Sequence, residues 1–383
     1  MSPQVRRRPS FSPRVALASI LMVAPIALAA CSLGQDKAEV LYVMGKNQFE
    51  VGNSEEAAKH WRAALAENPK HPGANFLLGA YFLQSGDLDG AEKHLTAAIA
   101  ADAKMTVAYN SLALVHIGRG NYAEAEKSFL HALQLNPDHL GVQQNLAGLY
   151  KEDGRLDQAE ALYRKVLKQN PSDLTTAVNL ADVQTLRGQY AEAEGVYTKA
   201  LQVAPEFAPA KLGLAKVLQA TDRLELAQKA LEEIALQAPN YALAYAELIA
   251  VMATRKDDLP RALALAEKWK AAEHSAPLRG LFEVGQAAAL IASGKEEEGR
   301  KVLEAAIARI AEVIRQQPTL TLKTWQLRAY GMLADSYERA GNPEKAAEAR
   351  AMKESLSMPA ASPAPTAQPE AAAQEHANET PSN

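Results

Sequence analysis

The residue of this sequence most clearly placed to do chemistry is a cysteine. Cys31 is the single cysteine among 383 residues, so the sequence predicts neither an intramolecular disulfide nor a zinc site built on thiolates. Arginines near the N-terminus precede an apolar run over residues 15–30 that Pro25 interrupts. This run is shorter than the ~20 residues that span a membrane. It fits the apolar part of a secretory signal peptide that ends in small residues.

The junction Leu28-Ala29-Ala30-Cys31 resembles the lipobox of bacterial lipoproteins. In that family the sulfur receives a diacylglyceryl group, the peptide is cut before the cysteine, and the new N-terminus is acylated. The resemblance implies a signal peptide over 1–30, a lipid on Cys31 and a short tether over 31–37. Several acyl chains anchor a protein stably, at ~0.8 kcal/mol per buried methylene. The alternative is an ordinary cleaved signal peptide that happens to precede a cysteine.

The residue after the lipidated cysteine bears on which membrane holds the protein. In the lipoprotein family an aspartate there favours retention at the inner membrane. This sequence has Ser32, so the resemblance implies the outer membrane of a bacterial envelope, on its periplasmic side.

Catalytic motifs are absent from the rest of the sequence. It has no Gly-x-Ser-x-Gly, Walker A, Gly-x-Gly-x-x-Gly or His-Glu-x-x-His stretch. His60 and His94 lie 34 residues apart and could bridge a metal, but solvated surface histidines are the favoured interpretation. The sequence therefore predicts a protein that is not an enzyme and has no metal and no cofactor.

A repeat of 34 residues predicts the elements that carry these residues. Its register starts from six alanines: Ala57, Ala91, Ala125, Ala159, Ala193 and Ala227. A bulky residue follows each at four residues: Trp61, Leu95, Phe129, Tyr163, Tyr197 and Leu231. A glycine or aspartate precedes each by five: Gly52, Gly86, Gly120, Gly154, Gly188 and Asp222. Twelve residues after each stands a proline or alanine: Pro69, Ala103, Pro137, Pro171, Pro205 and Pro239.

This register resembles the tetratricopeptide repeat (TPR) throughout residues 38–239, as six regular repeats. The resemblance implies an all-α fold, an α-solenoid in which antiparallel helix pairs stack into a right-handed superhelix. The small residues let the two helices of a repeat approach, and the bulky ones fill the space between repeats. The glycine ends the first helix in a left-handed conformation, and the proline ends the second helix.

The pattern loosens over residues 240–355, which we interpret as degenerate TPR-like hairpins and a C-terminal cap. A seventh hairpin carries one extra residue, and an eighth has a lengthened second helix reaching Gln317. A ninth spans 320–355. Residues 356–383 are rich in proline, alanine and polar residues and should be disordered, because they cannot bury a core.

Charge argues against nucleic acid as a partner. The formal net charge is -4, and removing the four arginines of residues 1–30 gives -4 - 4 = -8 for the mature chain. A mildly acidic protein lacks the basic surface that phosphate binding requires.

The first helices of TPR arrays line a concave face that often holds an extended peptide. Projecting the register onto that face gives the candidate binding residues Tyr42, Lys46, Phe76, Asn110, Gln144, Asn145, Asn179, Asp182 and Lys216. Asn145 and Asn179 share one repeat position, where related arrays use asparagine to hydrogen-bond a peptide backbone. The alternative is that these asparagines only satisfy backbone groups between helices.

Together these features predict a non-catalytic protein-interaction scaffold, lipid-anchored in the bacterial envelope. Its partners would be envelope proteins or extended peptide segments. Similar lipidated repeat proteins help assemble a type IV pilus secretin or an exopolysaccharide export system. Two alternatives stay open: an adaptor that regulates peptidoglycan hydrolases or proteases, and a glycan-binding module. The sequence does not predict an oligomeric state.

Overall fold

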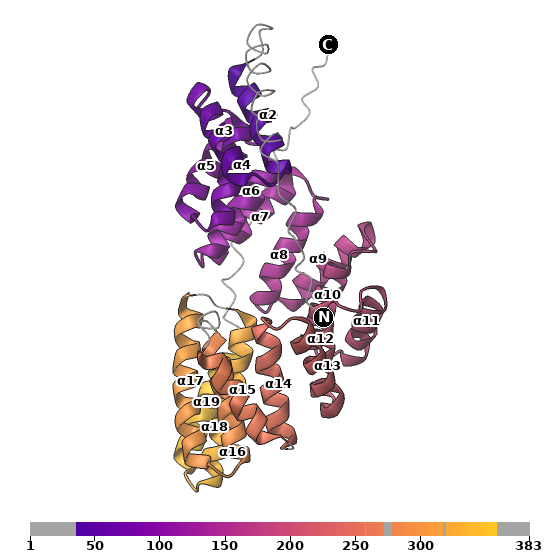
Figure 1. Ribbon diagram of the computed structural model, residues 1–383, viewed down its shortest axis with the longest axis vertical. Coiled ribbons are helices and arrows are strands. Elements are labelled where there is room, and N and C mark those ends of the chain that lie inside the picture. Colours follow the sequence, from indigo (N-terminus) through magenta and orange to yellow (C-terminus); the bar gives the residue numbers. More distant parts are fainter. Residues whose placement is uncertain (1–35, 257, 272–277, 317–318, 358–383) are drawn as a thin grey trace, which may run out of the picture. The chain divides into compact units, whose positions relative to one another are not determined.

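The computed structural model describes residues 36–256, 258–271, 278–316 and 319–357, and in these ranges all regular structure is helical (Figure 1). Eighteen α-helices, α2 to α19, follow one another in antiparallel pairs, which confirms the predicted fold class. None of the described helices is both long enough and apolar enough to cross a membrane. The predicted signal peptide, the predicted lipid anchor at Cys31 and residues 358–383 lie outside the described residues.

The chain divides into two compact units, one of residues 1–244 with 315–320 and one of 245–314 with 321–383. Six helix pairs make up the first unit. Their helices are α2 (Lys37–Glu50), α3 (Ser54–Glu67), α4 (Pro72–Ser85), α5 (Leu88–Ala101), α6 (Thr106–Gly118), α7 (Tyr122–Leu135), α8 (Leu140–Glu152), α9 (Leu156–Gln169), α10 (Leu174–Leu186), α11 (Tyr190–Val203), α12 (Ala208–Ala220) and α13 (Leu224–Gln237).

Backbone conformation ends the helices where the register predicts. All five predicted glycines have φ between 74° and 84°, and Asp222 takes the same left-handed region at 58°. Second helices end at an extended residue, such as Asn136 with φ of -140°, directly before the proline. A proline disfavours the helical conformation of the residue before it. Asp102 is equally extended before Ala103, so this turn keeps its shape without a proline.

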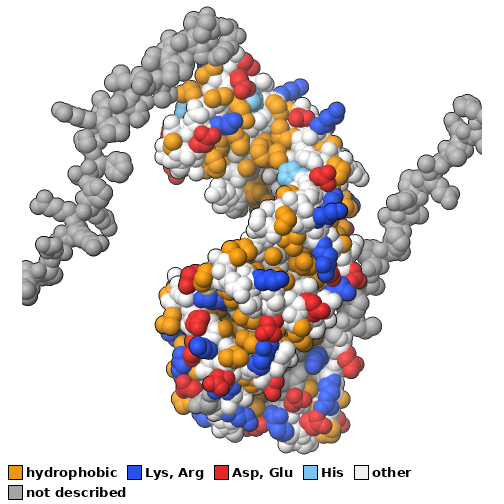
Figure 2. All heavy atoms as spheres, turned by 90° about the vertical axis from the view of Figure 1, so that its right-hand side faces the viewer, with side chains coloured by type: hydrophobic (Ala, Val, Ile, Leu, Met, Phe, Trp, Pro, Cys, Tyr) orange, Lys and Arg blue, Asp and Glu red, His pale blue; other side chains and the backbone are white. Residues whose placement is uncertain are grey.

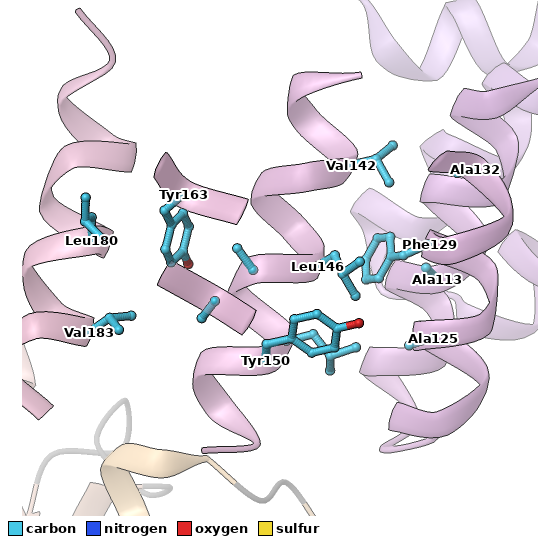
Figure 3. Close-up of a cluster of buried hydrophobic side chains, with 13 residues drawn as sticks. Ala113, Ala125, Phe129, Ala132, Val142, Leu146, Tyr150, Tyr163, Leu180 and Val183 are labelled. Atoms are coloured by element: carbon cyan, nitrogen blue, oxygen red, sulfur yellow. The ribbon is translucent and has the colours of Figure 1, made fainter. Parts of the chain in front are cut away.

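The core of the first unit consists of the small and bulky residues of the register. The six alanines are fully buried, and the six bulky residues are at most 1% exposed. Figure 3 shows Phe129, Leu146 and Tyr163, contributed by successive helices, within one buried cluster. Phe129 and Tyr163 therefore belong to a cluster that includes residues of more than one helix pair, as predicted.

Ion pairs between repeats form a second regular feature. A glutamate follows the register alanine in four consecutive repeats: Glu92, Glu126, Glu160 and Glu194. An arginine in the turn between the helices of the next repeat binds each one: Arg119, Arg155, Arg187 and Arg223. The Glu126–Arg155 pair is bidentate, with N···O distances of 2.9 and 2.8 Å. These pairs tie each second helix to the following repeat.

The second unit contains α15 (Leu259–Ala271), α16 (Arg279–Ala292), α17 (Glu296–Gln316), α18 (Leu320–Arg339) and α19 (Pro343–Ser357), and α14 (Ala242–Arg255) leads into it. The structure confirms the lengthened helix, because α17 has 21 residues. Trp269 stacks on Phe282 in its core, with ring centroids 5.5 Å apart. Left-handed residues still end the first helices, at Lys256, Gly294 and Gly341.

Two glycines inside first helices allow a matched test of this packing. A Cβ on Gly213 would lie 2.3 Å from ring atoms of the fully buried Tyr197, whereas a Cβ on Gly148 would lie 3.7 Å from the Tyr163 hydroxyl. We expect Gly213→Ala to lower the free energy of unfolding by ~1–3 kcal/mol, because overpacking displaces the ring. Gly148→Ala should raise it by ~0.5–1 kcal/mol through helix propensity. Urea unfolding followed by circular dichroism measures both, and equal effects would contradict the packing.

The Glu126 ion pair predicts a pH-dependent stability. Burial raises the pKa of Glu126, but hydrogen bonds from Arg155 and Tyr150 outweigh burial, and the pKa lies below its ordinary value of 4.5. A lowered carboxyl pKa stabilises the fold above the unfolded pKa, and this stability is lost as pH falls through the folded value. We expect Glu126→Gln to cost about 1 kcal/mol at pH 7, since the pair is partly exposed.

The cost of Glu126→Gln should disappear in unfolding experiments at pH values well below 4.5. Glu124→Gln is the control, because Glu124 and its partner Lys127 are both exposed. A cost that stays constant from pH 7 to pH 3, or an equal cost in the control, would rule out the ion pair as the cause.

Candidate functional site

A cavity of about 450 Å³ brings together three of the nine candidate binding residues, Gln144, Asn145 and Asn179. We call it the amide cavity. It is lined by Leu114, Ile117, Tyr122, Gln144, Asn145, Gly148, Leu149, Lys151, Glu152, Tyr163, Thr175 and Asn179. First helices α6, α8 and α10 supply most of this lining, and second helices α7 and α9 supply one tyrosine each.

The two register asparagines form hydrogen bonds between successive first helices. Asn145 Nδ2 donates to Asn110 Oδ1 at 2.9 Å, which joins α8 to α6. Lys151 Nζ donates to Asn179 Oδ1 at 3.3 Å, which joins α8 to α10. Both partners are side chains, so the alternative that these asparagines only satisfy backbone groups is wrong. In the part of the chain that the structure describes, Asn145 Oδ1 and Asn179 Nδ2 keep hydrogen-bonding capacity toward a ligand.

Gln144 has a structural role at the edge of the amide cavity. Its Nε2 lies 2.6 Å from both Asp173 Oδ2 and Thr176 Oγ1. Asp173 caps the N-terminus of α10, since its Oδ1 accepts from Thr176 N at 3.0 Å. Gln144 therefore holds α8 to the start of α10, and its amide N–H groups are already used.

Negative charge dominates the surroundings of the cavity. Asp182 accepts a hydrogen bond from the Tyr197 hydroxyl at 2.6 Å and lies 3.5 Å from Lys151 Nζ. Glu152 lines the cavity itself. Burial, followed by the charges of Asp182 and Glu152, raises the pKa of Tyr163. The Tyr163 hydroxyl therefore stays protonated and can donate a hydrogen bond.

The remaining candidates lie outside the amide cavity. Tyr42 packs on His71 with ring centroids 4.8 Å apart, and Lys46 Nζ is 5.6 Å from the centroid of the Tyr42 ring. Phe76 packs against the buried cluster that contains Leu95. Asn110 and Asp182 contact the cavity residues Asn145 and Lys151 without lining it. Lys216 is half-buried on α12.

Sequence reasoning missed the apolar and hydroxyl part of the cavity. Leu114 and Ile117 belong to a first helix whose apolar residues all look like core residues. Tyr163 occupies a position assigned to packing between repeats. The available signal is Gly148, because its repeat position carries a side chain in the two neighbouring repeats, Leu114 and Asp182.

The interpretation of the histidines needs correction. His94 is partly buried: its Nδ1 lies 3.0 Å from Asn75 Oδ1 and its ring stacks on Phe82. Burial lowers the pKa of His94. It is therefore a packed residue, not a solvated surface residue. No group of three or more His, Cys, Asp or Glu residues in the described ranges could hold a metal ion.

The charged surface offers no single-signed patch on the side that Figure 2 shows. Lysine and arginine side chains there are interspersed with aspartate, glutamate and apolar side chains. A charged ligand would therefore find no broad complementary surface on this face, whereas the amide cavity offers mostly neutral groups.

A comparison with curated proteins finds no match. Several solved structures are similar at low identity. The PilF structure from Pseudomonas aeruginosa is 22% identical, over 55% of this chain and 95% of that one, with a TM-score of 0.48. PilW, described as a widely conserved type IV pilus biogenesis factor, is 19% identical, over 53% and 96%, with a TM-score of 0.47. YrrB, described as a TPR protein with an unusual peptide-binding site, is 18% identical, over 49% and 96%, with a TM-score of 0.41.

Family models identify the repeat that the helix pairs form. Models described as tetratricopeptide repeats match residues 42–106, 85–139, 116–182 and 184–252. The matched region includes every helix that lines the amide cavity. Repeats of this type mediate protein and peptide binding. The chain belongs to the tetratricopeptide repeat family.

Proposed function

We propose that this protein is a non-catalytic scaffold, lipid-anchored in the bacterial envelope, that holds extended segments of partner proteins on its first helices. The amide cavity is the observation that carries this proposal. It exposes asparagine amides from adjacent repeats beside apolar side chains, and a peptide backbone has the matching donors and acceptors. The partners we propose are components of a type IV pilus secretin or an exopolysaccharide export system.

The chemistry of the cavity favours a peptide over the two other ligand classes. A glycan site usually offers the exposed face of an aromatic ring. Of the two tyrosines in the lining, Tyr163 is 1% exposed and Tyr122 packs against the buried cluster that contains Phe129. Catalysis would need a nucleophile with a base or a pair of acids. The cavity lining has one carboxylate, Glu152, and no histidine or cysteine.

Membrane attachment is the part of the proposal that rests on Cys31 and its lipobox. We expect Cys31→Ser to abolish incorporation of an alkyne-labelled fatty acid and to move the protein from the membrane fraction to the soluble fraction. Ser32→Ala is the matched control and should keep both label and location. Ser32→Asp should shift the labelled protein toward inner-membrane density on a sucrose gradient. A labelled, membrane-bound Cys31→Ser protein would contradict the anchor.

Partner capture tests the scaffold. Cross-linking in the native host, purification from membranes and mass spectrometry should recover secretin, pilus or polysaccharide-export proteins. The variant Asn145→Ala/Asn179→Ala should lose most of this recovery, because it removes the two cavity amides that keep hydrogen-bonding capacity toward a ligand. Gln134→Ala is the control, since it removes an exposed amide of second helix α7.

The same experiment separates the alternatives. Recovery of peptidoglycan hydrolases or proteases in place of assembly proteins would replace the scaffold with the adaptor. Recovery that is equal for the native chain and the double variant would show that the amide cavity is not the binding surface. No enrichment of envelope proteins at all would refute the proposal.

A further inference from the structure

Two neighbouring repeats differ at one buried hydroxyl. Tyr163 and Tyr197 hold the same repeat position, on α9 and α11. The Tyr197 hydroxyl donates to Asp182 at 2.6 Å and lies 3.4 Å from Thr185 Oγ1. The repeat therefore provides a complete set of partners for a tyrosine at this position.

Both of those partners are changed around Tyr163. The residue one repeat before Asp182 is Gly148, which has no side chain, and the residue before Thr185 is Lys151. Lys151 Nζ is directed to Asn179 and Asp182. Among the residues that the structure describes, nothing accepts a hydrogen bond from the Tyr163 hydroxyl.

This unpartnered hydroxyl faces the amide cavity. Tyr163 is 1% exposed, yet it lines the cavity together with Gly148. A Cβ on Gly148 would lie 3.7 Å from the Tyr163 hydroxyl oxygen, so the missing side chain is what opens the space in front of it. The hydroxyl oxygen is therefore open to the cavity, where a ligand can accept its hydrogen bond.

We propose that the Tyr163 hydroxyl donates to a backbone carbonyl of an extended peptide, whose oxygen takes the place that the Asp182 carboxylate fills beside Tyr197. This inference rests on the proposed function and assigns it a specific subsite. Gly148 is the specificity-determining residue of this subsite, because any larger side chain there would occupy the peptide's position.

The charges around the Tyr163 hydroxyl favour an uncharged hydrogen-bond acceptor over a carboxylate. Glu152 lines the cavity, and Asp182 lies close enough to add a second negative charge at the Tyr163 hydroxyl. Lys151 is the only cation in the lining, and Asp182 already pairs with it. A carboxylate would meet net repulsion here, whereas a peptide carbonyl carries no charge.

The apolar side of the cavity specifies what accompanies that carbonyl. Leu114, Ile117 and Leu149 line it together with the amides of Asn145 and Asn179. An apolar side chain of the peptide, next to the bonded carbonyl, would bury its surface against these residues. The subsite therefore takes an uncharged, apolar stretch of extended chain.

Peptide selection tests the subsite. A library of random 12-residue peptides displayed on phage is selected against the full chain in detergent, and the Kd of enriched peptides is measured by fluorescence polarisation. We expect Tyr163→Phe to raise the Kd roughly 3- to 10-fold, the effect of one neutral hydrogen bond. Gly148→Leu should raise it more than 10-fold, because the leucine side chain would occupy the space in front of the Tyr163 hydroxyl.

Matched controls separate binding from folding. Tyr163→Phe should leave the urea midpoint unchanged, because it removes a hydroxyl that has no partner. Tyr150→Phe removes a hydroxyl bonded to Glu126 at 2.9 Å outside the cavity. It should lower the urea midpoint and change the Kd less than 2-fold.

Thioamide substitution along the peptide identifies the acceptor. One substituted position should weaken binding to the native chain but not to Tyr163→Phe, since a thioamide is a poorer acceptor. If binding depends instead on an aspartate or glutamate of the peptide, the neutral acceptor is wrong. If the Kd of the enriched peptides is the same for the native chain, Tyr163→Phe and Gly148→Leu, the proposed subsite is wrong, whereas the proposed peptide-binding function stands. If no peptide is enriched, the proposed function fails with it.

Discussion

The close approach of two helices at a buried small residue is the constraint on which the rest of this structure depends. Gly45 makes it visible, because a Cβ there would lie 2.4 Å from Trp61 Nε1. Gly79 faces Leu95 in the same way, at 2.8 Å from Cγ. In each pair the bulky residue fills the volume that the small residue leaves. Since this exchange recurs every 34 residues, each repeat takes nearly the same shape, and equivalent side chains fall on equivalent faces.

Regular stacking explains how side chains distant in sequence meet in one cavity. Gln144 and Thr176 are 32 residues apart and bond directly, as do Asn110 and Asn145 at 35 residues. The glutamate–arginine pairs also join neighbouring repeats, through residues 27 to 29 apart. Two sets of contacts between consecutive repeats thus hold the lining of the amide cavity in place. The proposed binding surface is therefore held in place before a ligand arrives, and binding needs little further ordering of it.

The sequence predicts the fold well because the same small, bulky and helix-ending residues recur at the same spacing in every repeat. A lone glycine such as Gly120 means little, but six residues in phase specify where each first helix ends, and Asp222 shows that the position tolerates a side chain. The site is predicted less well. A projection onto the concave face locates Asn145 and Asn179, yet it cannot tell that Gln144 is held by Asp173. That distinction depends on side-chain geometry, which periodicity does not contain.

The proposed subsite lies where one repeat differs from its neighbours. Tyr197 has its hydrogen-bond acceptor within the repeat, because its hydroxyl donates to Asp182. A ligand is not needed to accept that hydrogen bond. At Gly148 the internal acceptor is missing while the donor, Tyr163, remains. The fold tolerates this because small side chains elsewhere in α8, among them the fully buried Ala147, preserve the helix contact. The residues that stabilise the fold and those of the proposed subsite are therefore different: the repeated residues supply the packing, and the single change at Gly148 leaves room for the proposed ligand.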